Sequence, residues 1–314
     1  MTVTEYRHDD VDAPELTGEP GSLLTVLDAC LVNGYGNKPA SGWTKPLSDT
    51  NRAAYQNSEA DGGTGCYVRV DDADGQFAGL ETFADMSDID TGVYGTWSDG
   101  SQSWLHKSQT ADGTPRPWML WADGLTWWLY VLDNGWVESY RRNHSFCGAG
   151  DYACFDPTNA FRYFALGQTG PDTLGGKRQH WCSALSLSDT PNSGGLTLAR
   201  LDGMSGGVEG RTQHRNAASG SSTGNCGQAQ PGVGAAGDYL FFDVLIGPQG
   251  AGESAYGIMR GVRWPIHRLT NSHVGGDAIG NLVFTPVNSS TSLGGSSNEG
   301  IAVGALLVDR EGPW

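Results

Sequence analysis

The sequence has few apolar residues and no long apolar run. Hydrophobic residues make up 38% of its 314 positions. No stretch approaches the roughly 20 apolar residues that a helix needs to cross a bilayer. The N-terminal segment MTVTEYRHDDVDAPELTGEP is polar and acidic, so it lacks the basic and apolar parts of a secretory leader. We therefore expect a protein made in the cytoplasm, without a membrane partner and without a recognisable export signal.

Basic residues are scarce as well. The chain has 19 Lys and Arg residues against 35 Asp and Glu residues, which gives a formal charge of −16. Because nucleic-acid binding depends mainly on cations that neutralise phosphates, this balance argues against a nucleic-acid partner. It also argues against binding to anionic membranes. A large negative charge keeps a protein soluble when it is present in many copies.

The common catalytic motifs are missing. The sequence has no P-loop, no dinucleotide-binding fingerprint and no Gly-x-Ser-x-Gly turn after a strand. We therefore expect no enzyme and no cofactor. One alternative stays open, because the many acidic residues and the 11 Trp residues would suit a carbohydrate-binding or glycoside-hydrolysing module. Zinc is disfavoured, since no Cys-x-x-Cys pair occurs among the candidate ligands His144, Cys147, Cys154, His180 and Cys182.

Two acidic segments are candidates for cation binding. Asp72–Glu81 matches the latter half of a calcium-binding loop, but the first ligand position is Val70, which has no side-chain oxygen. Asp85–Asp90 places three carboxylates within six residues. Asp, Ser and Gly also build turns by hydrogen bonding to their own backbone. We therefore interpret both segments as turns and expect no metal site.

Glycine and aromatic residues are abundant. The 47 Gly residues lack the three-residue period of collagen and fit tight turns between short strands. The 11 Trp, 11 Tyr and 9 Phe residues supply bulky apolar surface for a core. No fixed-period repeat and no alternation of strands with helices is present. We predict a mainly β fold, an antiparallel sandwich or open barrel with long Gly-rich loops, a short N-terminal helix and an extended N-terminal arm.

The N-terminal part contains three predicted features. Residues 1–20 lack periodicity and should form an arm that is disordered in the free subunit and ordered only on assembly. Residues 22–31 follow a helical pattern, with Leu23, Leu24, Leu27 and Leu31 on one face, and the pattern ends at Asn33-Gly34. Residues 66–70 alternate as a strand does, and residues 71–75 form a turn.

The strongest strand pattern lies at residues 116–141. Residues 118–121 and 125–132 are two strands joined by the turn Ala122-Asp123-Gly124, and Asn134-Gly135 leads to a third strand at 136–140. Aromatic side chains fall on both faces of this meander. It should therefore pack between two layers or against another chain. We expect four of its tryptophans to be mostly buried: Trp118, Trp121, Trp127 and Trp128.

The rest of the chain continues as strands around one low-complexity tract. Strands are predicted at residues 161–166, 180–187, 238–246, 256–266 and 301–308. Residues 203–237 are rich in Gly and Ser, and we predict an exposed loop there. The chain then divides into the arm 1–20, a β-rich domain 21–202, the loop 203–237, and C-terminal strands 238–314 that complete the same domain.

Six scattered cysteines are present, and small buried thiols are their simplest interpretation in the cytosol. Cys147 and Cys154 flank a Gly-rich segment and are the best candidates for a disulfide within the chain. Cys226 lies in the low-complexity tract, where no core requires a small apolar residue. We therefore predict that Cys226 forms an intermolecular disulfide with another subunit once the protein meets an oxidant.

Several separated blocks resemble a family of tailed-bacteriophage virion structural proteins. They are LDACLVNGYG (27–36), GWTK (42–45), NRAAY (51–55), CYVRVDD (66–72), ETFADMSDIDTG (81–92), RPWMLWAD (116–123) and GVRWPIH (261–267). We call these seven segments the resemblance blocks. The tract 203–237 and the ending Gly312-Pro313-Trp314 depart from the family pattern. The family is structural, so the resemblance implies no catalytic or cofactor-binding residue.

The resemblance implies a structural subunit of a tailed-phage virion. We expect it on the particle exterior, at the neck or collar or as a head-decorating minor capsid protein. A tail or baseplate component is the nearest alternative. Its partners would be further copies of itself and other virion proteins, such as capsid, neck or tail subunits. The expected location is the virion, after assembly in the host cytoplasm.

Overall fold

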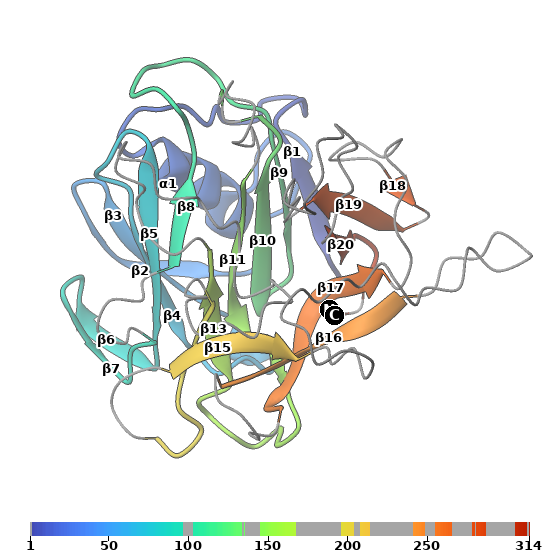
Figure 1. The fold of residues 1–314 in the computed structure, drawn as a ribbon. Helices are drawn as coiled ribbons and strands as arrows, with labels where there is room; N and C mark the ends of the chain where they lie inside the picture. The colour runs from blue at the N-terminus through green and yellow to red at the C-terminus, as the bar shows by residue number, and fades with distance from the viewer. Residues whose placement is uncertain are drawn as a thin grey trace, which may run out of the picture.

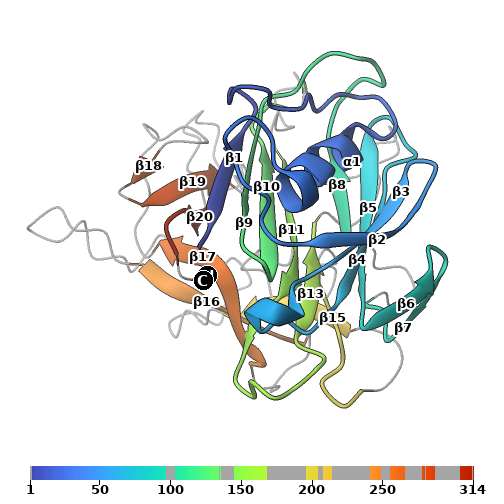
Figure 2. The same ribbon diagram turned by 180° about the vertical axis from the view of Figure 1, so that it is seen from behind.

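The computed structural model describes residues 2–96, 103–133, 135, 145–167, 196–203, 208–213, 241–248, 255–265, 278–279, 281–286, 305–312 and 314. Within these residues the protein consists mostly of antiparallel strands (Figure 1, Figure 2). One short helix, α1 (Ser22–Leu27), continues as a π-helical segment, η1 (Asp28–Asn33), and a 3-10 turn, η2, spans Glu59–Asp61. The predicted mainly β, antiparallel fold with a short N-terminal helix is confirmed. None of these helices is long and apolar enough to span a membrane.

The smaller of the two main sheets has five strands. Its strand order is β2-β3-β4-β5-β8, and each neighbouring pair is antiparallel. A separate hairpin, β6-β7, lies beside it. The predicted strand at residues 66–70 is confirmed as β4. The bounds are β2 (Thr44–Asp49), β3 (Arg52–Gln56), β4 (Tyr67–Asp71), β5 (Phe77–Phe83), β6 (Asp85–Asp88), β7 (Thr91–Val93) and β8 (Ser103–His106).

The larger sheet has thirteen strands within the described residues. Its order is β1-β9-β10-β11-β13-β14-β15-β16-β17-β20-β19-β18, and β12 pairs with β17. The C-terminal strands thus extend the sheet that the meander begins. The bounds are β1 (Thr4–Arg7), β9 (Trp118–Ala122), β10 (Thr126–Val131), β11 (Ser145–Asp151), β12 (Ala153–Cys154), β13 (Tyr163–Leu166), β14 (Leu196–Leu198), β15 (Val208–Gln213), β16 (Phe241–Pro248), β17 (Gly257–Pro265), β18 (Ala278–Ile279), β19 (Leu282–Pro286) and β20 (Ala305–Asp309).

Strands β9 and β10 bury both of their faces, as the two-sided aromatic pattern predicts. Trp118 and Trp127 belong to a core shared with α1 and the five-stranded sheet. Trp121 and Trp128 belong to a second core, shared with β16, β17, β19 and β20. The larger sheet therefore curls until its C-terminal strands cover the far face of β9–β11 (Figure 1). All four tryptophans are fully buried, which confirms the expectation for this meander.

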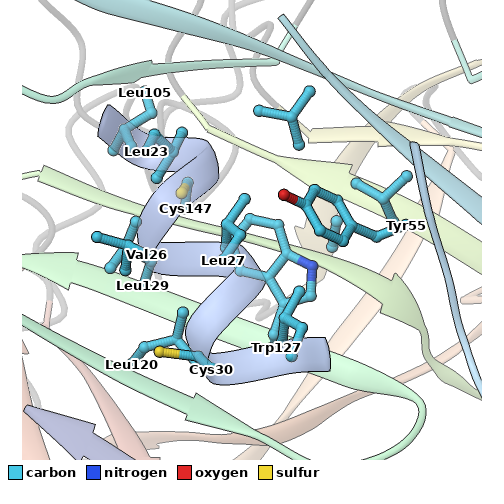
Figure 3. Close-up of a cluster of buried hydrophobic side chains, with 14 of the residues drawn as sticks. Leu23, Val26, Leu27, Cys30, Tyr55, Leu105, Leu120, Trp127, Leu129 and Cys147 are labelled. Carbon is cyan, nitrogen blue, oxygen red and sulfur yellow. The ribbon is translucent and has the colours of Figure 1, made fainter. Parts of the chain in front are cut away.

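The helix α1 fills the space between the two sheets (Figure 2). Its apolar side chains Leu23, Val26 and Leu27 face Leu129 and Trp127 of β10 (Figure 3). Tyr55 of β3 and Leu105 of β8 belong to the same core, and the same view shows them close to the helix. Because a helix of six residues is too short to be stable alone, its stability comes from this burial.

The predicted arm at residues 1–20 requires a correction. Thr4–Arg7 form β1, which pairs with β9 from Thr4↔Ala122 to Arg7↔Met119. Tyr6 and Leu16 are fully buried, so these side chains bury apolar surface within the same chain. The end of the chain lies beside this strand, because a side chain at Gly312 would come within 2.8 Å of Val3. The expectation of an arm disordered in the free subunit is therefore wrong for β1.

The predicted loop at 203–237 is also wrong in part. Val208–Gln213 form β15, which pairs with β14 on one side and with β16 on the other. The rest of the tract from residue 214 onward, and the predicted strands at 136–140 and 180–187, lie outside the described residues. Predicted strands at 161–166, 238–246, 256–266 and 301–308 correspond to β13, β16, β17 and β20. No strand was predicted at the positions of β1–β3, β5–β8, β11, β12, β14, β15, β18 or β19.

Candidate functional site

The first resemblance block builds the π-helical segment η1 and the turn that ends it. Cys30 and Leu31 are fully buried beside the central strands. Gly34 follows η1 with φ of 74°, and a Cβ there would lie 2.6 Å from the carbonyl oxygen of Lys38. Only glycine avoids both the steric strain and this collision. The backbone geometry of this turn therefore explains the first glycine of the Gly-Tyr-Gly segment without a bound ligand.

The turn that follows covers the exposed edge of β1. Lys38 Nζ donates to the carbonyl oxygen of Glu5 at 2.8 Å. The backbone N–H of Arg7 donates to Asp10 Oδ2 at 2.8 Å and to the hydroxyl of Tyr35 at 3.2 Å. An unpaired strand edge is a template for pairing with another chain. Tyr35 of the first block, together with the nearby Lys38 and Asp10, thus satisfies an edge that would otherwise be open.

The resemblance blocks contact one another across the fold. Trp43 Nε1 of the GWTK block donates to the carbonyl oxygen of Asp123, in the RPWMLWAD block, at 2.8 Å. The hydroxyl of Tyr55 donates to Asp28 Oδ1 at 2.8 Å, which joins the NRAAY block to the first block. These segments lie far apart in the sequence. Their polar groups therefore form hydrogen bonds that connect separate elements of the fold.

Asp123 fastens the meander to the C-terminal strands as well. Its Oδ1 accepts from the backbone N–H groups of Leu125 and Thr126, at 2.8 and 2.9 Å, and so closes the predicted turn. Its Oδ2 lies 2.5 Å from Nη2 of Arg260 on β17. The carboxylate is fully buried and the Arg260 side chain is 12% exposed. One carboxylate therefore orders a hairpin and pairs with a cation from the C-terminal strands.

A buried ion pair joins the N-terminus of α1 to the five-stranded sheet. Asp72, in the turn after β4, pairs with Lys107, which follows β8, and both side chains are fully buried. Lys107 Nζ also donates to the carbonyl oxygen of Glu19 at 2.8 Å, and Asp72 Oδ2 accepts from the N–H of Leu23 at 2.8 Å. Burial raises the pKa of Asp72 to about 6, against the effect of the Lys107 charge. Burial lowers the pKa of Lys107.

Another buried carboxylate lies at the end of β11. Asp151 accepts from the N–H and the hydroxyl of Thr64, at 2.8 and 2.6 Å, and from the Cys66 thiol at 3.5 Å. Burial raises the pKa of Cys66 well above the ordinary thiol value, and the Asp151 charge raises it further. Since the thiolate is the reactive form, Cys66 is poorly suited to act as a nucleophile.

The acidic segments that the sequence raised as candidate cation sites form ion pairs and hydrogen bonds within the chain. Glu81 pairs with Arg69 at 2.6 Å, and Asp74 Oδ1 accepts from the N–H of Phe77 at 3.0 Å. In the second segment, Asp90 pairs with Arg52. Within the described residues, no group of three His, Cys, Asp or Glu side chains is arranged to hold a metal ion.

The predicted disulfide between Cys147 and Cys154 is absent. Cys147 points into the core beside α1, whereas Cys154 packs against the second core. The strand β11 separates them: its alternation places Cys147 on one face of the sheet, and the chain then turns towards β17 through β12. Spacing alone could not reveal that the two thiols belong to different layers. Cys226 and Cys182 lie outside the described residues.

The outer face of the five-stranded sheet carries a shallow hollow of about 50 Å³. Strands β4, β5 and β8 bring its polar and aromatic side chains together, and the partly exposed Trp104 lies directly across from Gly79. No sequence pattern indicated this group of residues. The hollow is lined by Arg69, Asp71, Gly79, Leu80, Glu81 and Trp104.

Comparison with known proteins gives no family for the chain: no protein-family model matches it, and neither does any curated protein.

Proposed function

We propose that the chain is a structural subunit of a tailed-phage virion, on the particle exterior at the neck or collar or as a head-decorating minor capsid protein. A tail or baseplate component is the nearest variant. The observation that carries the proposal is the convergence of the resemblance blocks. Trp43 with Asp123 and Tyr55 with Asp28 join blocks that are far apart in the sequence.

The bonds within these blocks support a scaffold role. The polar side chains named in them bind other parts of the same chain: Tyr35 accepts from β1, Asp72 pairs with Lys107 and accepts from the helix, and Asp90 pairs with Arg52. If proteins resemble one another because they share a fold, the similar segments should be those whose contacts stabilise that fold. Segments shared because of catalysis would instead direct reactive groups towards a common cleft.

The surface charge agrees with a subunit present in many copies. A formal charge of −16 keeps free subunits apart at high concentration before assembly. Contacts in the particle would then depend on local apolar surface. Val93, Tyr94 and Phe155 are large exposed side chains, with exposed fractions of 50%, 40% and 60%. They are candidates for contacts with neighbouring virion proteins.

The test is the protein composition of purified virions. Antiserum raised against the recombinant chain should detect it in particles purified on a density gradient, and immunogold labelling should place it on the exterior. Quantitative mass spectrometry against the major capsid protein gives its copy number. A six- or twelve-fold number favours the neck, and an icosahedral multiple favours head decoration. Absence from washed particles would refute the proposal.

A further inference from the structure

The outer face of the five-stranded sheet combines an indole ring with groups that donate and accept hydrogen bonds. Cross-strand register places Asp71, Gly79 and Trp104 in one row across β4, β5 and β8. The neighbouring row pairs Arg69 with Glu81. These side chains border the 50 Å³ hollow described above.

We infer that this hollow is a saccharide-binding subsite, with Trp104 as the stacking platform for one neutral pyranose ring. A pyranose presents a face of C–H groups, which packs favourably against an aromatic ring, and a rim of hydroxyls. Binding sites for small polar ligands combine such apolar surface with a few fixed polar groups. The inference is independent of the proposed virion role.

Gly79 makes room for the indole ring of Trp104. A Cβ at Gly79 would lie 3.6 Å from Cζ3 of Trp104, so the indole lies against a strand that has no side chain at this position. The backbone conformation does not require glycine at this position, because Gly79 is not among the residues with positive φ. Any larger side chain here would project into the hollow beside Trp104. Glycine therefore keeps the hollow open.

The polar groups match a hydroxyl-rich ligand better than a cation. Arg69 uses Nη2 for Glu81 and Nη1 for the carbonyl oxygen of Ile89, out of the five N–H groups that a guanidinium carries. Glu81 and the exposed Asp71 supply acceptor oxygens. Sugar hydroxyls both donate and accept, so they can use both kinds of group. A cationic ligand would gain from Asp71 alone, because Arg69 and Glu81 already neutralise each other at 2.6 Å.

The size of the hollow limits the ligand to a shallow contact. A volume of about 50 Å³ is far below the roughly 300 Å³ of a typical enclosed ligand pocket. The sugar would lie against the sheet, with one face on the indole and the other in solvent. For so small a contact we expect a dissociation constant of about 1 mM. Useful affinity would come from many copies acting together.

The test is a titration of the full chain with neutral hexasaccharides. Cello-, laminari-, chito-, manno- and isomaltohexaose are each titrated to about 10 mM and followed by isothermal calorimetry, which detects affinities near 1 mM. At least one should bind. Trp104→Ala should weaken that binding at least about 10-fold, because the stacking surface is lost, whereas Trp104→Phe should lose no more than about 3-fold. Gly79→Val should weaken it by about 10-fold by filling the hollow.

Two controls separate loss of the site from loss of the fold. Phe155→Ala removes an aromatic side chain that is 60% exposed and does not line the hollow, so it should leave saccharide binding unchanged. Urea midpoints of all variants show whether they remain folded. No binding by any hexasaccharide, or binding that Trp104→Ala leaves intact in folded protein, overturns the inference.

Discussion

Replacing Lys107 by methionine should destabilise the fold by about 3–5 kcal/mol, because it leaves the Asp72 carboxylate buried without its counter-charge. Both side chains are fully excluded from solvent in the wild-type protein. Methionine keeps most of the apolar length of lysine, so the main loss is the ammonium group. The carbonyl oxygen of Glu19 loses its 2.8 Å bond from Nζ at the same time.

The pH dependence of this variant follows from the pKa of Asp72. Burial raises that pKa from 3.8 to about 6, so the ionised form is disfavoured in the folded state. The resulting penalty is absent below pH 3.8 and grows as the pH rises through about 6. Without Lys107 the penalty above pH 6 becomes larger. The stability difference between wild type and Lys107→Met should therefore be greatest at neutral pH and shrink as the pH falls towards 4.

The assay is equilibrium unfolding in urea, followed by tryptophan fluorescence and circular dichroism. Coincident transitions establish two-state behaviour, which the free energies require. The double variant Asp72→Asn with Lys107→Met removes both charges and should be more stable than Lys107→Met alone. A loss below about 1 kcal/mol for Lys107→Met, or a double variant less stable than the single one, would refute the buried-pair argument.

Three further predictions concern other parts of the fold. Trp128→Ala should lower the free energy of unfolding by about 3–5 kcal/mol in urea, since the side chain is fully buried; a loss under about 1 kcal/mol would contradict this. Lys38→Ala should uncover the edge of β1 and increase concentration-dependent self-association in light scattering, whereas Lys38→Arg should not. Cys30 and Cys66 should resist thiol reagents in the native protein, because burial raises the pKa of both; rapid labelling without unfolding would show that they are accessible.

The meander was predictable because its signals are local. Alternating apolar residues and an Asp-Gly turn determine a hairpin wherever it lies, and two-sided aromatics require a layer on each face. The structure also explains why aromatic residues are so frequent in this meander. Trp128 stacks on Phe146 with ring centroids 5.2 Å apart, and Gly148 of β11 leaves space for its indole. Such cross-strand pairs depend on register, which the sequence does not display.

The N-terminal strand was missed because its partner is distant in the sequence. Thr-Glu-Tyr-Arg has a short polar pattern, and Tyr6 is its only fully buried large side chain. Its pairing with β9 spans more than a hundred residues, and its outer edge is satisfied by Tyr35 and Lys38. A segment that looks too polar to fold can still be ordered when others supply the apolar surface and the bonds.

The hollow at Trp104 shows why the candidate site was harder to predict than the fold. Its side chains come from three strands, and the adjacent Asp72–Glu81 segment indicated a cation-binding loop or a turn, not this hollow. Register across β4, β5 and β8 alone puts Asp71, Gly79 and Trp104 in one row. The sequence did show an unusual density of tryptophan, and among the described residues most of that signal belongs to the core, where Trp118, Trp121, Trp127 and Trp128 lie. Trp104 differs because it is partly exposed, lies over a glycine and borders charged groups. These are properties of neighbours in space, so a composition argument could raise carbohydrate binding as an alternative without being able to locate it.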